Sequence, residues 1–505
     1  MSCSKLGNLP ELTYEVIKYL QNDYSTLHSC VLVNRLWCRL AIPLLWENPF
    51  SIPTENYNFI EIYLHNLNGE LKTKFNEHEI NENLLPSNTL FNYPSFIKYL
   101  DLLKISISVG EWFYTAKIKN LDLVKDTTIS LLKIFIENEV NLHTLEIKIN
   151  HYYITYFKDI LELTLQNPNF IRNAKNFELS ILTRFRDNST LIDNLILQVI
   201  KLHQNLKKVI LSYYNLPFYQ SLLLSKDYNC SNTLNTITLY HVNFKGIINL
   251  SKIFEQLNVL ESVHIIHCEN LNTSFIQQIL NLTKPFKLKS LFINAISNID
   301  ESSLLLLQKS GGYLKNFSVK YLTYFESGLA QQILESVMKY CKNIEFLDIY
   351  GITNETVYPV INLIENIKQN LNCLSINCGE SSLDNNSSIL LQNLGQILPS
   401  KLEYLDLTLY IKVSDFKVFL KNSQGTFIKK LLIRDLKQKV NCDLLPHLKK
   451  YIMKEKRVRY LNFRNLHKEL FDYRDIVKEF KSHNIRVQKY NDLHFDMYQL
   501  MQKLD

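Results

Sequence analysis

Glycine and proline are scarce in this sequence, at 11 and 12 of 505 residues. A parallel β-helix with glycine turns or a collagen-like chain needs far more of both, so the composition excludes these classes. No apolar run is long enough to span a membrane, and the N-terminus has neither the apolar stretch nor the cleavage site of a secretion signal. We therefore expect a soluble, folded protein of the cytoplasm, the nucleus or both.

Signs of catalytic chemistry are missing as well. The nine cysteines are scattered without a CxxC pair, and the sequence contains no phosphate-binding loop, dinucleotide fingerprint, HExxH helix or GxSxG elbow. We expect reduced and mostly buried thiols, no cofactor, no metal site and no enzymatic activity of the chain's own.

What the sequence does have is a short pattern, apolar-x-x-apolar-x-apolar, that keeps returning. Successive copies begin 26 to 32 residues apart. Their first residues are Leu142, Ala174, Leu206, Leu234, Leu260, Leu288, Leu314, Ile344, Leu371, Leu402, Ile428 and Val458. Such a period is typical of a solenoid, in which each unit buries its apolar side against the next. Two earlier copies, at Ile97 and Ile118, lie closer together and are predicted to be degenerate terminal repeats.

Each copy continues into a stretch with helical spacing, such as residues 333–341, whose apolar side chains fall on one stripe. The repeat is therefore strand, turn and helix. It predicts an α/β fold with a curved parallel sheet on the inside and helices on the outside. The pattern resembles the leucine-rich repeat over residues 96–490, and residues 260–271, with Cys268, are similar to its cysteine-containing subtype.

Residues 1–50 do not follow the repeat. Pro10 suits the first turn of a helix, where its missing N–H costs nothing. A second helix is predicted to begin at Ser25 or Thr26 and to carry Trp37, with Pro43 ending or kinking it. The region is predicted to contain two or three short helices with more apolar surface than so small a unit can bury, so we expect it to need a partner.

The same region resembles the F-box, a module whose helices insert into the Skp-family adaptor of cullin-RING ubiquitin ligases. The resemblance is carried by Leu9-Pro10 and, at the family's spacing, by Val33-Asn34-Arg35-x-Trp37 with Leu40-Ala41. It implies that a fixed set of residues binds the adaptor: Leu9, Pro10, Leu12, Ile17, Leu20, Leu27, Cys30, Val33, Asn34 and Trp37. The alternative is a plain helical cap on the solenoid.

The segments around the repeats are predicted to play supporting roles. Residues 51–95 form a linker or packing segment, with an amphipathic helix over residues 57–67 and an exposed polar loop over residues 69–93. Residues 491–505 are predicted to form a helix that caps the open end of the solenoid, through Leu493, Met497, Leu500 and Met501.

The concave side of the solenoid is a candidate binding surface, because residues between the apolar strand positions point there. Residues 415–490 contain 20 Lys and Arg against 8 Asp and Glu, while the whole chain has a net charge of +7. We expect a target protein with an acidic or phosphorylated segment. It would contact Phe346, Tyr350, Tyr404, Lys430, Arg434, Tyr460 and Arg464. Solvated outer helices can explain part of the basic charge, and β-propensity can explain part of the aromatic residues on the strands. Nucleic acid is a less favoured ligand than an acidic protein segment.

The two resemblances together imply a substrate-recognition subunit of an SCF-type (Skp–cullin–F-box) ubiquitin ligase. Such a receptor does no chemistry and places its target near a separate ubiquitin-charged enzyme. The alternative is a leucine-rich-repeat scaffold that binds a partner protein without ubiquitylation. Neither hypothesis involves a membrane.

Overall fold

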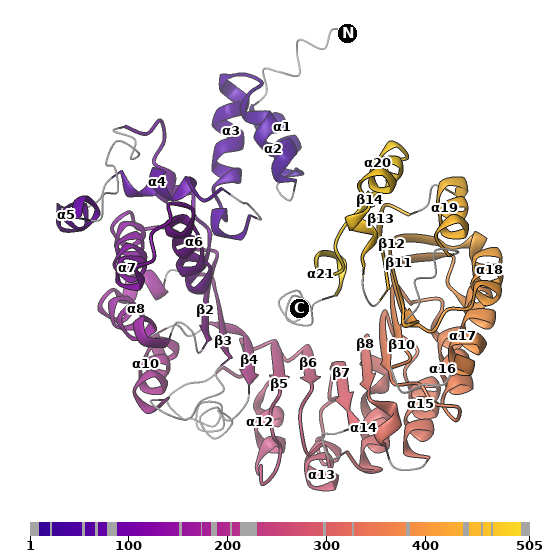
Figure 1. Ribbon diagram of the computed structural model, residues 1–505. Helices are drawn as coiled ribbons and strands as arrows, with labels where there is room; N and C mark the ends of the chain where they lie inside the picture. The colour runs from indigo at the N-terminus through magenta and orange to yellow at the C-terminus, as the bar shows by residue number, and fades with distance from the viewer. Residues whose placement is uncertain are drawn as a thin grey trace. The chain divides into compact units, whose positions relative to one another are not determined.

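The structure is a computed structural model (Figure 1). It describes residues 10–20, 23–52, 56–65, 69–77, 88–150, 154–172, 174–182, 189–202, 205–212, 230–295, 299–325, 328–379, 384–437, 444–455, 458–465 and 468–495. The chain forms two compact units, Met1–Leu234 and Asn235–Asp505. The boundary between them falls inside the region that the sequence predicts to be repetitive.

Three helices open the first unit: α1 (Pro10–Lys18), α2 (Tyr24–Val31) and α3 (Arg35–Leu45). They share a small core of five buried side chains, namely Ile17, Leu27, Cys30, Ala41 and Leu44. Pro43 lies inside α3, which ends two residues later. These helices therefore form a region with an interior of its own.

Two polar side chains set the boundaries of the later helices. The Asp23 carboxylate accepts a hydrogen bond from the backbone N–H of Thr26 at 3.1 Å, and the Asn34 side chain accepts one from Trp37 at 2.9 Å. Side-chain acceptors satisfy the free N–H groups of a first turn, so each of these residues starts a helix. Three helices agree with the predicted two or three. The second one, however, is capped by Asp23 rather than by Ser25 or Thr26, and it ends before Trp37, which lies in α3.

The segment between these helices and the first strand is more helical than predicted. It contains η2 (Pro49–Ser51), α4 (Phe59–Leu64), α5 (Gly69–Glu77) and η4 (Tyr93–Phe96). Leu71 and Phe75, one turn apart in α5, are buried, and the Phe75 ring centroid lies 6.1 Å from those of Trp112 and Phe113. The predicted polar loop is wrong for residues 69–77, because one apolar pair at this spacing is enough to dock a short helix. Residues 78–87 lie outside the described residues.

Four parallel strands in chain order form the sheet of the first unit. They are β1 (Tyr99–Asp101), β2 (Thr144–Asn150), β3 (Asn176–Leu182) and β4 (Leu206–Ser212). The helices between them are α6 (Leu102–Thr115), α7 (Leu121–Glu137), α8 (Ile154–Gln166), α9 (Pro168–Arg172) and α10 (Ser189–Leu202). The apolar copy at Ile97 is confirmed as a strand. The copy at Ile118 is wrong as a repeat, because the Asn120 side chain accepts hydrogen bonds from the N–H groups of Asp122 and Leu123 and so starts α7 there.

The second unit has ten parallel strands, each beside its neighbour in the sequence. They are β5 (Thr236–Tyr240), β6 (Ser262–Ile266), β7 (Leu288–Asn294), β8 (Asn316–Lys320), β9 (Phe346–Tyr350), β10 (Cys373–Asn377), β11 (Lys401–Leu409), β12 (Phe427–Asp435), β13 (Tyr460–Arg464) and β14 (Arg486–Val487). The connections contain α12 (Leu250–Gln256), α13 (Thr273–Leu280), α14 (Ser302–Ser310), η6 (Gly311–Tyr313), η7 (Leu322–Tyr324), α15 (Leu329–Tyr340), α16 (Val357–Ile367), α17 (Asp384–Ile397), α18 (Val413–Asn422), η8 (Ser423–Gly425), α19 (Leu444–Glu455), η9 (Leu470–Asp472) and α20 (Arg474–Ser482). Helices cover the convex side of this sheet and leave the strands on the concave side (Figure 1). The predicted alternation of strand and helix is confirmed, as parallel neighbours require a crossover.

The apolar positions of the repeat form the core between sheet and helices. Leu405 of β11 and Leu431 of β12 are register partners, and both are fully buried. Cys268 and Cys341 are also fully buried, and burial raises the pKa of each thiol to about 12. These cysteines therefore remain neutral core residues.

The last described residues turn back onto the sheet of the second unit. The short helix α21 (Tyr490–Leu493) contacts β12 and β13, and Leu493 packs against Tyr404 and Leu432. Leu493 therefore lies on the concave face, whereas the apolar stripe that contains it was predicted to cap the end of the sheet. The rest of that stripe, from residue 496 on, lies outside the described residues.

Candidate functional site

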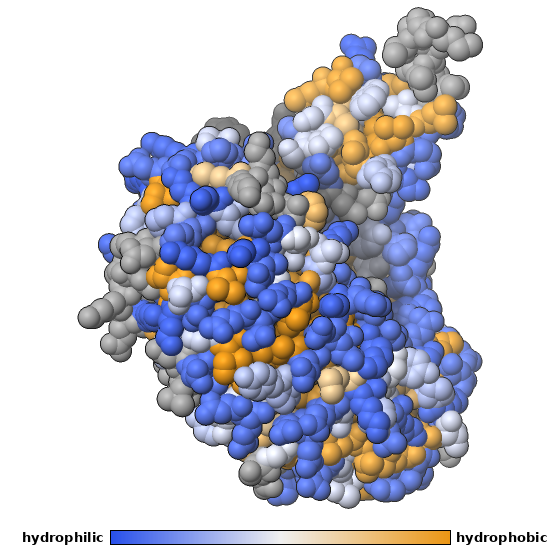
Figure 2. Space-filling view, turned by 90° about the vertical axis from the view of Figure 1, so that its right-hand side faces the viewer, coloured by the Kyte–Doolittle hydropathy of each residue, from blue (hydrophilic) through white to orange (hydrophobic). Residues whose placement is uncertain are grey.

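Apolar side chains are exposed on the N-terminal helices. Leu12 and Val16, one turn apart on α1, have exposed fractions of 50% and 58%, and Leu32 and Val33, between α2 and α3, have 77% and 57%. The space-filling view shows hydrophobic residues gathered on the part that carries these helices, at its top (Figure 2). These are two pairs of exposed apolar neighbours, and grouped apolar residues mark interaction sites more often than single ones. We call these four residues the docking face.

The residues predicted to bind the adaptor lie in different places. Four are exposed: Pro10, Leu12, Val33 and Asn34. Three lie in the core of the helices: Ile17, Leu27 and Cys30. Two are partly buried against that core: Leu20 and Trp37. Asn34 caps α3, and Leu9 lies outside the described residues. The exposed residues can touch a partner directly, and the three core residues hold the helices in shape.

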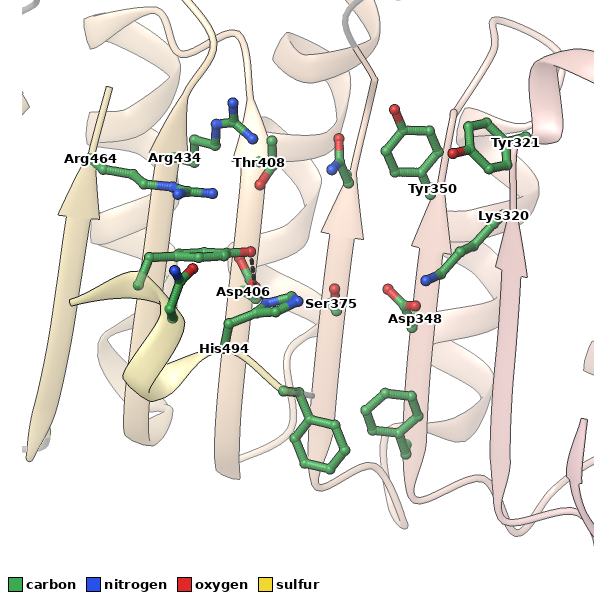
Figure 3. Close-up of a pocket in the computed structure, with 15 residues that line it drawn as sticks. Lys320, Tyr321, Asp348, Tyr350, Ser375, Asp406, Thr408, Arg434, Arg464 and His494 are labelled. Carbon is green, nitrogen blue, oxygen red and sulfur yellow. Dashed lines mark hydrogen bonds and ion pairs between the residues drawn. The ribbon is translucent and has the colours of Figure 1, made fainter. Parts of the chain in front are cut away.

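A cavity of about 570 Å³ opens on the concave face of the second unit (Figure 3). It is lined by strands β8 to β13 and by the chain after residue 489. The lining residues are Lys320, Tyr321, Phe346, Asp348, Tyr350, Ser375, Asn377, Asp406, Thr408, Arg434, Arg464, Tyr490, Asn491, His494 and Phe495. We call this cavity the concave pocket.

Strand register arranges the lining residues in rows across the sheet. One row consists of Tyr350, Asn377, Thr408, Arg434 and Arg464, each the register partner of the next. Register partners in a parallel sheet point to the same face from strands about 4.8 Å apart. The two arginines, which belong to separate repeats, therefore stand side by side at one end of the pocket.

A second row, two residues earlier on each strand, brings carboxylates onto the floor. Asp348, Ser375 and Asp406 are register partners. Oδ2 of Asp406 accepts hydrogen bonds from the hydroxyls of Tyr404 at 3.1 Å and Tyr490 at 2.9 Å. Burial and the charge of Asp406 raise the pKa of both tyrosines, so both hydroxyls stay protonated donors.

The arginines are less well satisfied than the carboxylates. Among the described residues, Arg434 forms no hydrogen bond and no ion pair, although it is only partly exposed. The Arg464 guanidinium lies 3.5 Å from the ring centroid of Tyr490 and 3.9 Å from Glu469, and its Nε is buried without a partner in the described part of the chain. Burial lowers the pKa of Arg464, and the neighbouring charge of Arg434 acts in the same direction. This end of the pocket is therefore positive and has unused donors.

The pocket also has aromatic walls and a third cation. Lys320 enters from β8 and forms no ion pair with a described residue. The rings of Tyr321 and Tyr350 meet edge to face at 4.9 Å between centroids. In Figure 3 these three side chains line the end of the pocket opposite the arginines. A ligand that bridges the two ends would meet positive charge at both.

The residues predicted to bind a target are only partly brought together. Four line the pocket: Phe346, Tyr350, Arg434 and Arg464. Three do not: Tyr404, Lys430 and Tyr460. Phe346 and Tyr404, predicted to be open on the concave face, are only 5% and 3% exposed, because the chain after residue 489 covers them. In this structure their rings are therefore covered, and target contact by these two residues stays a prediction.

Sequence analysis missed other lining residues. Ser375 and Asn377 occupy the same repeat positions as Asp406 and Thr408, so alignment of the repeats by their register would have found them. No sequence signal points to residues 490–495, which lie far along the chain from the strands that they cover.

Within the described ranges, no group of three His, Cys, Asp or Glu side chains could hold a metal ion. In the same part of the chain, no helix is long and apolar enough to cross a membrane. No model of a known protein family matches the sequence, and a search of curated proteins finds no match. The site must therefore be interpreted from its own geometry.

Proposed function

We propose that this chain is the substrate receptor of an SCF-type ubiquitin ligase, built from F-box-like helices and leucine-rich repeats. The N-terminal helices dock a Skp-family adaptor, and the concave pocket holds an acidic or phosphorylated segment of a target protein. The observation that carries the proposal is the docking face: four apolar side chains left in water by helices that already have a core.

The docking face has the properties that insertion into an adaptor requires. Leu12 and Val33 belong to the sequence pattern that resembles the F-box, and both are exposed. Covering them removes apolar surface from water, which stabilises a complex by about 25 cal/mol per Å². Ile17 and Leu27 belong to the same pattern but are buried, and we propose that they stabilise the packing of the helices rather than contact the adaptor.

The concave pocket favours an anionic ligand. Arg434 and Arg464 offer guanidinium groups from neighbouring strands, and such groups grip carboxylate or phosphate through paired hydrogen bonds. Tyr350, Asn377 and Thr408 continue the row with aromatic and hydrogen-bonding side chains that contact the rest of a peptide. The receptor itself does no chemistry, and ubiquitin transfer follows from the proximity of the held target to a charged enzyme.

A scaffold that binds its partner without ubiquitylation is the second candidate. The concave pocket fits this function equally well, so only the docking face separates the two. Purification of the intact chain with the Skp adaptor is the deciding experiment. A complex of the adaptor, cullin and RING subunits with this chain supports the proposal, and a folded chain that binds no adaptor leaves only the scaffold.

The target half of the proposal has its own test. Arg434→Glu/Arg464→Glu should reduce co-precipitation or proximity labelling of target proteins and leave adaptor binding intact. The matched control is Arg459→Glu/Arg474→Glu, which changes the net charge equally at two exposed arginines outside the pocket. Equal target capture by the two double variants would show that the pocket is not the binding site.

A further inference from the structure

The chain after residue 489 lies across the concave face as a strap, which we define as residues 490–495. Leu493 packs between the side chains of Tyr404 and Leu432, and the Phe495 ring lies 5.0 Å from that of Phe346 and 5.8 Å from that of Tyr404. The backbone N–H of Phe495 donates to the Tyr404 hydroxyl at 3.2 Å. The strap is therefore anchored on strands β9, β11 and β12, on the floor of the concave pocket.

The strap also supplies hydrogen-bond donors to one carboxylate. The Tyr490 hydroxyl lies 2.9 Å and the His494 Nδ1 lies 3.1 Å from the same Oδ2 atom of Asp406 (Figure 3). The other oxygen, Oδ1, is buried and has no partner among the described residues. Without the two strap donors, Asp406 would keep the hydroxyl of Tyr404 as its one donor among the described side chains. An under-satisfied buried carboxylate draws in any cation within reach.

Arg434 is such a cation. It follows Leu432 by two residues on β12, and Leu432 is the register partner of Asp406. A long, flexible arginine side chain spans this diagonal. In the structure it does not do so: Figure 3 shows the Arg434 guanidinium turned away from Asp406, and no ion pair joins them. Among the described residues the Arg434 guanidinium thus has no ion-pair partner, while the Asp406 carboxylate is engaged by the strap.

We infer that the strap makes the concave pocket selective for anions, by holding Asp406 so that Arg434 stays available, beside Arg464, for an anionic group of the ligand. The inference rests on the proposed function only for the ligand class, an acidic or phosphorylated segment. It also fixes the sign of the strap's effect. A strap that merely blocked the pocket would weaken anion binding, whereas this strap strengthens it.

The test uses the full chain and phenyl phosphate, a small phosphate monoester with an aromatic ring, titrated by calorimetry. Tyr490→Phe/His494→Ala removes both strap donors and keeps the ring that stacks on Arg464. We expect phenyl phosphate to bind this variant about tenfold more weakly than the unmodified chain. The matched control is Tyr473→Phe/His483→Ala, which changes the same residue types outside the pocket and should bind as the unmodified chain does.

A second set of variants removes the negative charge of Asp406 from the floor of the pocket. Asp406→Asn should bind phenyl phosphate at least as tightly as the unmodified chain, and adding the two strap substitutions to it should change nothing, because no carboxylate remains to capture Arg434. A tenfold loss that persists in the triple variant would show that the strap contacts the anion directly. Removal of residues 490–505 extends the test, and it too should weaken binding.

The remaining outcomes separate this inference from the proposed function. Equal binding by the unmodified chain and the strap variant overturns the inference alone. Tighter binding by the variant also overturns it and makes the strap a competitor of the ligand. No binding by the unmodified chain overturns both the inference and the target half of the proposed function, while adaptor binding tests the other half independently.

Discussion

Truncating Leu12 and Val33 to alanine should weaken binding of the Skp adaptor about 30-fold. Full burial of a leucine or valine side chain is worth about 2 kcal/mol. The two side chains are 50% and 57% exposed in the free chain, so docking can bury about half of each. The loss is then about 1 kcal/mol per residue, or about 2 kcal/mol together, which corresponds to the stated factor in Kd.

Because both residues are exposed, the double variant should keep the stability of the unmodified chain within about 0.5 kcal/mol. Calorimetric titration with purified adaptor measures the affinity, and thermal unfolding checks the fold. The control is Leu121→Ala, which truncates a side chain of the same unit that is 79% exposed but lies outside the docking face. A Kd that stays within twofold of the unmodified chain in the double variant would refute the docking face as the adaptor site.

Two further substitutions test the interior of the first unit. Trp37→Ala removes a large side chain that packs on the core of the N-terminal helices. We expect the free energy of unfolding of these helices to fall by about 3 kcal/mol and adaptor binding to be lost. Limited proteolysis should show that the second unit is still folded. Normal adaptor affinity of the variant would contradict the assigned role of Trp37. Lys148→Met leaves the buried carboxylate of Asp101 without the ammonium that now lies 2.8 Å away, and Glu146 without its partner at 2.9 Å, which should cost about 3 kcal/mol at pH 8. Burial raises the pKa of Glu146 to about 7, so its folded form binds a proton that the unfolded chain releases above about pH 4.5. The contribution of Glu146 to stability therefore falls as pH rises from about 4.5 to about 7. In denaturant titrations, the loss of unfolding free energy caused by Lys148→Met should become smaller toward pH 4.5. A loss that does not change with pH would show that the charge of Glu146 is not its cause.

Strand positions and helix-covered faces followed from the sequence, because they depend on local apolar spacing. A strand whose inward side chains alternate with outward ones carries the same signal in each repeat, so β2 to β13 lie where the apolar pattern recurs. The row that contains Arg434 and Arg464 follows from the same period, since side chains at equal repeat positions become register partners. Leu12 and Val33, which are exposed on the first helices, also belong to a local sequence pattern, the one that resembles the F-box.

Local spacing failed where a polar side chain or a distant contact decided the structure. Asn34 divides a stretch that is apolar enough for one helix, and Asn120 starts a helix at what looks like another copy of the strand pattern. Helix α5 is held in place because Phe75 packs on the rings of Trp112 and Phe113. The sequence of α5 alone does not predict this contact.

The binding surface itself was decided by tertiary structure. From the sequence, Tyr404 is predicted to contact a target on the concave face, and nothing distinguishes Asp406. In the fold both are covered by residues 490–495, which lie more than 80 positions further along the chain. Sequence period determines which side chains point to the concave face, because that depends on neighbouring residues in one strand. Which of those side chains remain open to a ligand depends on contacts between segments distant in the sequence, and these form only when the chain folds.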